Sequence, residues 1–280
     1  MSKKILSTLL VTAIFCGCSS KKINSANPLS DPDNKGGWAI YDQMTDEFEG
    51  AELDSSKWHN YNPDWKGRAP AMFDSNNVVV KDGKLYLYLR NEPNKTVLNN
   101  LSIGLAGNNN SPDADGFSGF TSAAVKSKEP VKYGYFEIKA KSMKVNACNA
   151  FWFYNRGLDW WNEIDVFEIV GSKGFEKTVN MNMHVFRDPT SNHHFEKHDE
   201  YHHTENLADN LHVYGVEWDE QTIKWYFDSK LIRTLENNYC HDPLHLNLDV
   251  ETMPDWVGLP DPNTLPAEYV IEYVRAWKKR

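Results

Sequence analysis

The sequence predicts an all-β domain built as a sandwich or barrel of antiparallel strands. Many short segments alternate apolar and polar residues with a period of two, and turn-forming residues separate them. After the first residues, no stretch shows the long apolar stripe of an amphipathic helix. Frequent turns between short strands favour a sandwich or a barrel, and 280 residues suit a single domain of this kind.

Individual strands can be placed from these patterns. A hairpin is predicted at residues 77–89, where Asp82-Gly83 forms the turn between two apolar segments. A second hairpin is predicted at residues 222–235, with its turn at Asp228-Ser229-Lys230. Three further segments alternate as strands do: residues 121–128, 133–140 and 269–277.

The N-terminus has the pattern of a bacterial export signal. Two lysines precede an apolar run at residues 5–15, which is shorter than the about 20 residues that a membrane span needs. The run ends in Phe15-Cys16-Gly17-Cys18, which resembles a lipoprotein box. We therefore expect removal of residues 1–17 and lipidation of Cys18, with ordinary signal cleavage as the alternative.

The rest of the chain divides into a linker and one domain. Residues 18–37 are rich in Ser, Asn, Asp and Pro, so we expect a flexible tether. Residues 38–280 show neither an internal repeat nor a second linker and are expected to form one folded domain. The predicted protein is a monomer that a lipid holds to a bacterial membrane, at the outer membrane, the cell surface or the periplasmic side.

The charge and the aromatic content restrict the possible partners. The formal net charge is −9, and loss of residues 1–17, which contain Lys3 and Lys4 and no acid, makes it −9 − 2 = −11. This balance argues against nucleic acid, which is bound mainly through Lys and Arg. Aromatic residues make up 13% of the chain, so a surface on which sugar rings stack is a natural explanation beside core packing.

Three acidic residues lie close together in one predicted strand. Glu163 and Asp165 share a face by the two-residue period, and the intervening Ile164 and Val166 have the character of core residues. Crowded carboxylates raise one another's pKa, which is a property that acid/base catalysts need. The alternative is an exposed strand face with ordinary polar alternation.

The third acid, Glu168, requires an irregular strand. It lies five positions after Glu163, so a regular strand would turn it to the opposite face. One extra residue in a β-bulge near Val166-Phe167 would return it to the side of Glu163. Glycosidases that retain anomeric configuration hold two carboxyl groups about 5–5.5 Å apart. We therefore predict a bulge, with Glu163 as nucleophile, Glu168 as acid/base and Asp165 as the hydrogen-bonding partner of Glu163.

The acidic segment, which follows Trp160-Trp161, resembles the bulged Glu-x-Asp-x-x-Glu motif of glycoside hydrolase family 16. Other segments of residues 38–280 resemble the family in the same order: Asp46-Glu47-Phe48, Leu53–Trp58, Tyr133–Glu137, Ala150–Phe153 and Glu217-Trp218. The resemblance implies a β-jelly-roll of two curved antiparallel sheets with an open concave cleft. It also implies retaining endo-hydrolysis of β-linked glycans by double displacement, although transglycosylation would use the same intermediate.

Three segments resemble the agarase and porphyranase branch of that family: Trp65–Pro70, Asn180–Phe186 and Asn247–Pro254. A red-algal galactan, agarose or porphyran, is therefore the expected substrate, with laminarinase-like β-glucanase and carrageenase activities as alternatives. A sulfated galactan calls for a local arginine, because guanidinium groups form paired hydrogen bonds to anions. Arg68 and Arg156 are the candidates, with an ordinary ion pair as the alternative for each.

Other residues are candidates for sugar contacts. Trp65, Trp160 and Trp161 are either stacking platforms or core, and at least one of the adjacent pair should face the cleft. His184 is expected on the strand beside the acids, near the acid/base or else in the core. Glu251 is a candidate for a contact with a sugar hydroxyl.

Metal sites and cysteine pairing complete the predictions. The five histidines between His193 and His203 lie among acids in what looks like a solvated loop, so we expect no catalytic metal. Some family members bind a structural calcium on the convex face, but Glu272 stands where Asp is common, which weakens that expectation, and no other cofactor is implied. Cys148 and Cys240 are either a disulfide or buried free thiols. A non-catalytic carbohydrate-binding sandwich protein is the rival class, although it would not need three clustered acids.

Overall fold

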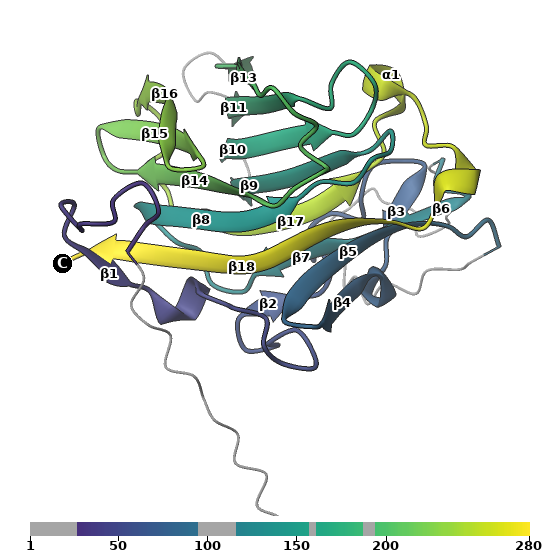
Figure 1. The fold of residues 1–280 in the computed structure, drawn as a ribbon, viewed down its shortest axis with the longest axis horizontal. Helices are drawn as coiled ribbons and strands as arrows, with labels where there is room; N and C mark the ends of the chain where they lie inside the picture. Colours follow the sequence, from purple (N-terminus) through teal and green to yellow (C-terminus); the bar gives the residue numbers. More distant parts are fainter. Residues whose placement is uncertain (1–26, 95–115, 157–160, 187–193) are drawn as a thin grey trace, which may run out of the picture.

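The computed structural model describes residues 27–94, 116–156, 161–186 and 194–280, and within these ranges the chain is almost entirely β-structure. Its strands form two sheets, and the long strand β18 (Ala267–Lys279) crosses the middle of one of them (Figure 1). Over the described residues one sheet has ten strands and the other has eight. The prediction of an all-β sandwich is confirmed.

The ten-stranded sheet is antiparallel except for the pair β3–β6. Its strands are, in spatial order, β16 (Lys230–Glu236), β15 (Thr222–Phe227), β14 (His212–Trp218), β8 (Gly134–Lys141), β18, β5 (Lys84–Asn91), β6 (Phe120–Ser122) and β3 (Ala71–Phe73), with β1 (Trp38–Ile40) on β18 and β4 (Val78–Lys81) on β5.

The eight-stranded sheet is antiparallel throughout. Its strands are, in spatial order, β12 (Phe195–Glu196), β11 (Thr178–Phe186), β10 (Trp161–Val170), β9 (Cys148–Arg156), β17 (His245–Glu251), β7 (Ala124–Ser127) and β2 (Trp58–His59), with β13 (Asp199–His202) on β11. Short helical turns complete the described chain: η1 (Asp42–Met44), η2 (Ser75–Asn77), α1 (Pro254–Val257) and η4 (Pro262–Thr264). None of its helices is long and apolar enough to cross a membrane.

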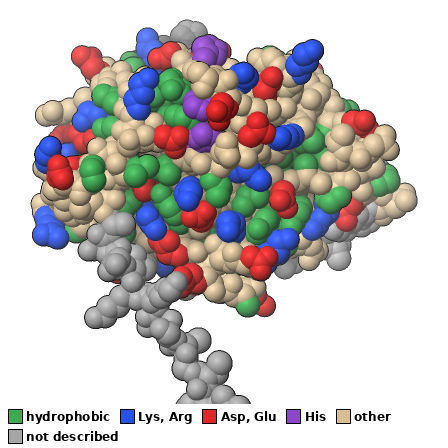
Figure 2. Space-filling model, in the orientation of Figure 1, with side chains coloured by type: hydrophobic (Ala, Val, Ile, Leu, Met, Phe, Trp, Pro, Cys, Tyr) green, Lys and Arg blue, Asp and Glu red, His purple; other side chains and the backbone are tan. Residues whose placement is uncertain are grey.

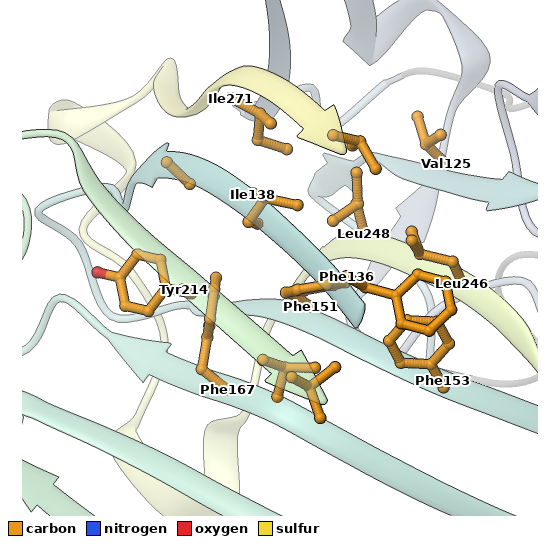
Figure 3. Close-up of a cluster of buried hydrophobic side chains, with 14 of the residues drawn as sticks. Val125, Phe136, Ile138, Phe151, Phe153, Phe167, Tyr214, Leu246, Leu248 and Ile271 are labelled. Carbon is orange, nitrogen blue, oxygen red and sulfur yellow. The ribbon is translucent and has the colours of Figure 1, made fainter. Parts of the chain in front are cut away.

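The core lies between the two sheets and is rich in aromatic side chains (Figure 3). Phe136 of β8 packs on Phe153 of β9, with ring centroids 4.9 Å apart, and Phe167 of β10 contacts Tyr214 of β14 at 4.4 Å. Alternate residues of a strand point to opposite faces. The remaining side chains of β9 and β10 therefore point away from the core, onto the outer face of the eight-stranded sheet.

Both predicted hairpins are present. Asp82 and Gly83 have φ angles of 51° and 68°, and Asp228 and Ser229 have φ angles of 45° and 72°. Two consecutive residues with positive φ are the signature of the tight turns that suit the right-handed twist of paired strands. The predicted strand at 121–128 differs from expectation, because it divides at Ala123 into β6 and β7, which belong to different sheets.

Residues 27–37, which were expected to belong to a flexible tether, form ordered turns against the ten-stranded sheet. The backbone N–H of Leu29 donates to Glu137 at 3.0 Å, and the hydroxyl of Ser30 donates to that of Tyr135 at 2.8 Å. Beside these turns, Trp38 packs with Tyr135 and Trp277 in a small second cluster. The tether prediction is therefore wrong for these residues, because the sheet offers them buried polar and aromatic partners that composition does not reveal.

Acidic and basic side chains are interspersed over the face of the molecule shown in Figure 2. The structure also contains ion pairs, such as Lys139 with Glu272 at 2.9 Å and Arg275 with Glu47 at 2.7 Å. The net negative charge is therefore not gathered on the face that Figure 2 shows.

Candidate active site

Strand β10 contains the predicted bulge. Against β9, Asp165 lies opposite Trp152 and Phe167 lies opposite Phe151, so two steps along β10 match one step along its partner. Against β11, three steps from Asp165 to Glu168 match two. The register shift places the extra residue at Val166-Phe167, and the prediction of a bulge is confirmed.

The bulge determines which side chains share a face. Val166 and Phe167 are consecutive, yet both belong to the buried core between the sheets. The face alternation is therefore reset, and Glu168 points to the same side as Glu163 and Asp165. All three acids line one hollow of about 230 Å³ on the outer face of the eight-stranded sheet.

Two side chains satisfy the backbone where the ladder is interrupted. The indole N–H of Trp225, from β15 of the other sheet, donates to the carbonyl oxygen of Asp165 at 2.9 Å. The side-chain amide of Asn180 donates to the carbonyl oxygen of Glu168, also at 2.9 Å. A buried carbonyl left without a partner costs about 1–3 kcal/mol. Sequence reasoning missed both supports, because Trp225 lies 60 residues from the carbonyl that it serves.

The hollow is formed by the loop before β3 and by strands β9, β10, β11 and β17. Its lining residues are Asn62, Trp65, Arg68, Ala150, Trp152, Tyr154, Glu163, Asp165, Glu168, Phe186 and Glu251. The predicted residues Trp65, Arg68 and Glu251 are thus brought beside the three acids, although they lie far away in the sequence. Trp65 is partly exposed and packs edge to face against Trp152, with ring centroids 6.5 Å apart. It therefore forms part of the wall of the hollow and does not belong to the core.

Arg68 and Glu251 form an ion pair within the hollow. Arg68 Nε lies 2.6 Å from Glu251 Oε2, and the side chains are 50% and 6% exposed, respectively. The ion pair that is the alternative role of Arg68 is therefore present. It engages Nε of the guanidinium, and half of the arginine side chain remains exposed to solvent.

Burial and mutual repulsion perturb the two glutamates. Burial, with repulsion from Asp165 and Glu251, raises the pKa of Glu168 to about 8, while Arg68 and a hydrogen bond from the Cys148 thiol act in the opposite direction. Burial and the neighbouring Asp165 and Glu168 raise the pKa of Glu163 as well. The pair therefore retains a proton near neutral pH, as a nucleophile beside a general acid requires.

Cys148 is a buried neighbour of Glu168. Its Sγ is 3.7 Å from Glu168 Oε1, and the residue is completely buried. Burial and the nearby acids hold the pKa of this thiol well above its usual range, so the sulfur carries a proton and acts as the donor. Cys148 and Cys240 are both buried free thiols, so of the two alternatives the structure shows the free thiols and not the disulfide.

His184 on β11 lies directly opposite Glu163. Its Nε2 is 3.3 Å from Asp165 Oδ2 and 3.9 Å from Glu163 Oε1. The histidine therefore lies on the side of the cleft and not in the core, and among the three clustered acids it approaches Asp165 and Glu163 and not the acid/base Glu168.

The remaining predicted residues divide into described and undescribed ones. Trp161 stacks on Phe186 of β11 with ring centroids 4.9 Å apart, and Phe186 lines the hollow, so Trp161 extends the aromatic wall. Trp160, Cys18 and the side chain of Arg156 lie outside the described residues. Arg156 is described only as the backbone partner of Trp161.

Sequence reasoning also missed Asn62 and Asp249. Asn62 is buried, and within the described chain its amide Nδ2 has no hydrogen-bond partner although the residue lines the hollow. Asp249 accepts a hydrogen bond from the indole of Trp152 at 2.9 Å and so holds that ring. Two-residue alternation from Glu251 could have assigned Asp249 to the cleft side, whereas Asn62 lies in a loop without a periodic signal.

The surroundings of Glu272 do not suit a calcium ion. The carboxylate of Glu272 forms an ion pair with Lys139 at 2.9 Å, so the lysine ammonium already neutralises its negative charge. Elsewhere among the described residues, two groups of three side chains have ligand atoms close enough to share an ion, and both contain His184. The first consists of Glu163, Asp165 and His184, and the second of His184, His194 and Glu196.

A two-sheet β-sandwich with three clustered acids in a cleft on its outer face defines a class of enzymes, the sandwich-fold glycoside hydrolases. Residues 38–279 match the family model described as the GH16 domain of β-porphyranases A–D, so the chain belongs to this branch of glycoside hydrolase family 16. The family resemblance inferred from the motifs is confirmed.

Known relatives agree with this assignment. The chain is 27% identical to β-porphyranase B of Zobellia galactanivorans over 97% of its own length and 94% of the relative's. It is also 27% identical to β-porphyranase B of Phocaeicola plebeius, with coverage of 78% and 76%. The crystal structure of the Zobellia enzyme superposes with a TM-score of 0.74 at 26% identity, covering 86% of this chain and 92% of that one. The jelly-roll architecture is thereby confirmed.

Proposed function

We propose that this enzyme is a retaining endo-hydrolase of a β-linked red-algal galactan, with porphyran as its first substrate and agarose as the alternative. The observation that carries the proposal is the bulged strand, which brings Glu163 and Glu168 into one hollow. Membership of the β-porphyranase branch and the names of its relatives support the substrate class.

The proposed reaction uses the two glutamates in turn. Glu163 attacks the anomeric carbon while Glu168 gives its proton to the departing sugar oxygen. Glu168, now a carboxylate, then removes a proton from the water that hydrolyses the glycosyl-enzyme. Asp165 lies between the two on the same face and, with His184 3.3 Å away, maintains the position and the charge of the nucleophile.

Substrate binding is proposed to use the aromatic wall and Arg68. Trp65, Trp152 and Phe186 offer ring faces and edges to sugar rings. The half-exposed guanidinium of Arg68 offers hydrogen-bond donors to a sulfate ester, while its ion pair with the nearly buried Glu251 holds it in position. The buried amide of Asn62, without a partner among the described residues, is a further donor for a sugar hydroxyl.

A substrate panel tests this proposal. The enzyme is incubated with porphyran, agarose, κ-carrageenan, laminarin and mixed-linkage glucan, and product sizes are followed over time. We expect internal cleavage of porphyran or agarose, with oligosaccharides appearing early. Glu163→Gln should lose at least about 10³-fold in turnover while it still binds the polymer. Cleavage of laminarin and mixed-linkage glucan alone would refute the galactan assignment.

Export and anchoring form a separate part of the proposal. The lipoprotein-like segment ending at Cys18 supports lipidation of that cysteine and attachment of a monomeric enzyme to a bacterial membrane, on the cell surface or in the periplasm. Metabolic labelling with a palmitate analogue, followed by membrane fractionation, tests it. Cys18→Ser should abolish both the label and the membrane association, and retention of both would refute the anchor.

A further inference from the structure

The rim of the cleft contains a group of metal-ligating atoms that the reaction does not use. His184 Nδ1 lies 3.0 Å from His194 Nε2 and 3.4 Å from Glu196 Oε2. All three atoms lie within 4.8 Å of one another. Zinc binds nitrogen and oxygen ligands at about 2.0–2.2 Å, so the ligands of a tetrahedral ion lie roughly 3.3 Å apart. The observed separations are on either side of that value.

The chemistry of the donors selects the ion. Imidazole nitrogen suits zinc, copper and nickel, whereas calcium and magnesium take oxygen ligands. Two imidazoles with one carboxylate form a ligand set that is well known for zinc with an open fourth position. At present the two histidines share a hydrogen bond, and an ion would replace the proton between them.

The strands hold these ligands in position. His184 and Glu196 are direct cross-strand partners on β11 and β12, and His194, which directly precedes β12, has a ligand atom close to both. Asn182 donates to Glu196 Oε2 at 3.1 Å, and the ring of His194 stacks on Phe186 at 4.4 Å with an interplanar angle of 3°. Such outer contacts orient ligands and strengthen metal binding.

The site is open to solvent on one side and touches the catalytic acids on the other. Glu196 is 52% exposed, whereas His184 is 14% exposed. The second nitrogen of His184, Nε2, lies 3.3 Å from Asp165 Oδ2. An ion on Nδ1 leaves the proton of the imidazole on Nε2, facing Asp165 and Glu163, so one ring connects the ion to the acids.

We propose that His184, His194 and Glu196 form a binding site for a divalent transition-metal ion, with Zn²⁺ as the first occupant, and that occupation inhibits the enzyme. The bound ion fixes the His184 ring and places positive charge beside the nucleophile, whose negative charge the first step consumes. The inhibition rests on the proposed function, whereas the binding does not.

Direct binding tests the site independently of catalysis. The EDTA-treated enzyme is titrated with Zn²⁺ by calorimetry, and with Co²⁺ while the visible absorption of tetrahedral cobalt is recorded. We expect one Zn²⁺ per chain and no heat with Mg²⁺. His194→Ala and Glu196→Gln should each weaken binding by about 10–100-fold. His198→Ala is the matched control, because His198 is exposed in the same histidine-rich segment but lies outside the group.

The second group of potential ligands provides the decisive contrast. If Zn²⁺ instead binds the acids through His184 Nε2, Glu163→Gln will abolish binding and His194→Ala will not, and this result overturns the proposal. Absence of Zn²⁺ binding to the wild-type protein also overturns it. Inhibition is then measured with the galactan that the enzyme is found to cleave, and each rate is compared with the metal-free rate of the same variant. Zn²⁺ should inhibit the wild type and His198→Ala, but His194→Ala only at a concentration at least tenfold higher.

Discussion

At the scale of single residues, the site shows how one carboxyl group acquires a proton at neutral pH. Glu163, Asp165 and Glu168 line the same hollow, and each additional negative charge there is opposed by burial and by its neighbours. Among the described residues, the guanidinium of Arg68 and the thiol of Cys148 act in the opposite direction on Glu168. The working form of the pair has one proton, so the rate should fall as pH rises through about 8.

Cys148→Ala tests the contribution of the thiol. The hydrogen bond from Cys148 favours the ionised form of Glu168 and lowers its pKa. Its removal should therefore move the alkaline limb of the kcat/KM profile upward by about 0.5 pH unit, since a weak bond is worth less than the 1.4 kcal/mol of a full unit. Cys240→Ala is the control, because Cys240 is also a buried free thiol, whereas the thiol that hydrogen-bonds Glu168 is that of Cys148. An unchanged alkaline limb in Cys148→Ala would show that the thiol does not lower the pKa of Glu168.

Arg68→Lys tests the recognition of sulfate. Lysine keeps a positive charge opposite Glu251 but lacks the planar fork of guanidinium donors. We expect kcat/KM on porphyran to fall about tenfold or more, because hydrogen bonds to charged groups contribute about 1.5–3 kcal/mol. Activity on desulfated substrate should fall much less. Equal losses on both substrates would mean that Arg68 acts only by holding Glu251.

At the scale of the secondary-structure elements, the bulge in β10 makes the site possible. It directs Val166 and Phe167 together into the core and returns Glu168 to the side of Glu163. Its backbone is held from both sides, by Trp225 across the sandwich and by Asn180 on the neighbouring strand. The position of the acid/base thus depends on a tryptophan that does not line the hollow.

Trp225→Phe tests this dependence. The substitution keeps an aromatic ring in the core but leaves the carbonyl of Asp165 without its donor, which should cost about 1–3 kcal/mol in the free energy of unfolding. We expect a loss of kcat in the same variant, because the bulge relaxes. Trp218→Phe is the matched control, since the buried Trp218 donates in the same way to Cys240, at 2.9 Å and away from the bulge. Both variants should be destabilised in denaturant titrations, and equal losses of kcat would contradict a specific role of Trp225.

Local patterns in the sequence predicted the elements of this site better than its surroundings. The bulge was predictable, because the pattern of three acids and their apolar neighbours indicates which residues face the core and which residues face the cleft. The division of residues 121–128 at Ala123 was not, since apolar residues continue through the point at which the chain changes sheets. The contacts of Trp225 and Asn62 join distant segments, and no local period records them.

At the scale of the whole molecule, the buried acids of the active site lower the free energy of unfolding as pH rises. In the unfolded chain Glu168 loses its proton near the ordinary glutamate pKa of 4.5, whereas the folded chain retains that proton until about pH 8. The contribution of this group to stability is therefore present below pH 4.5 and is lost as pH rises through 8. Glu163, Asp249 and Glu251 also have raised pKa values, so their contributions change in the same direction.

Glu168→Gln should consequently stabilise the enzyme at alkaline pH while it removes the acid/base. We expect about 1–3 kcal/mol of stabilisation at pH 8 and almost none at pH 4, because a neutral amide escapes the cost of ionising in the cleft. Thermal unfolding at both pH values measures this. Glu272→Gln, which breaks a partly exposed pair with Lys139, should change stability by less than about 1 kcal/mol at either pH. A Glu168→Gln protein that is destabilised at pH 8 would contradict the raised pKa.

Glu163 and Glu168 lie on one face across a single bulge, where we propose that they act as nucleophile and acid/base. The most direct test is the anomeric configuration of the first product. It is recorded by ¹H NMR within minutes of adding the enzyme to the intact galactan that it is found to cleave. Double displacement predicts that the β-anomer appears first and that the α-anomer grows in later by mutarotation. Initial appearance of the α-anomer would show that water attacks the sugar directly, and the assignment of Glu163 as nucleophile would then be wrong.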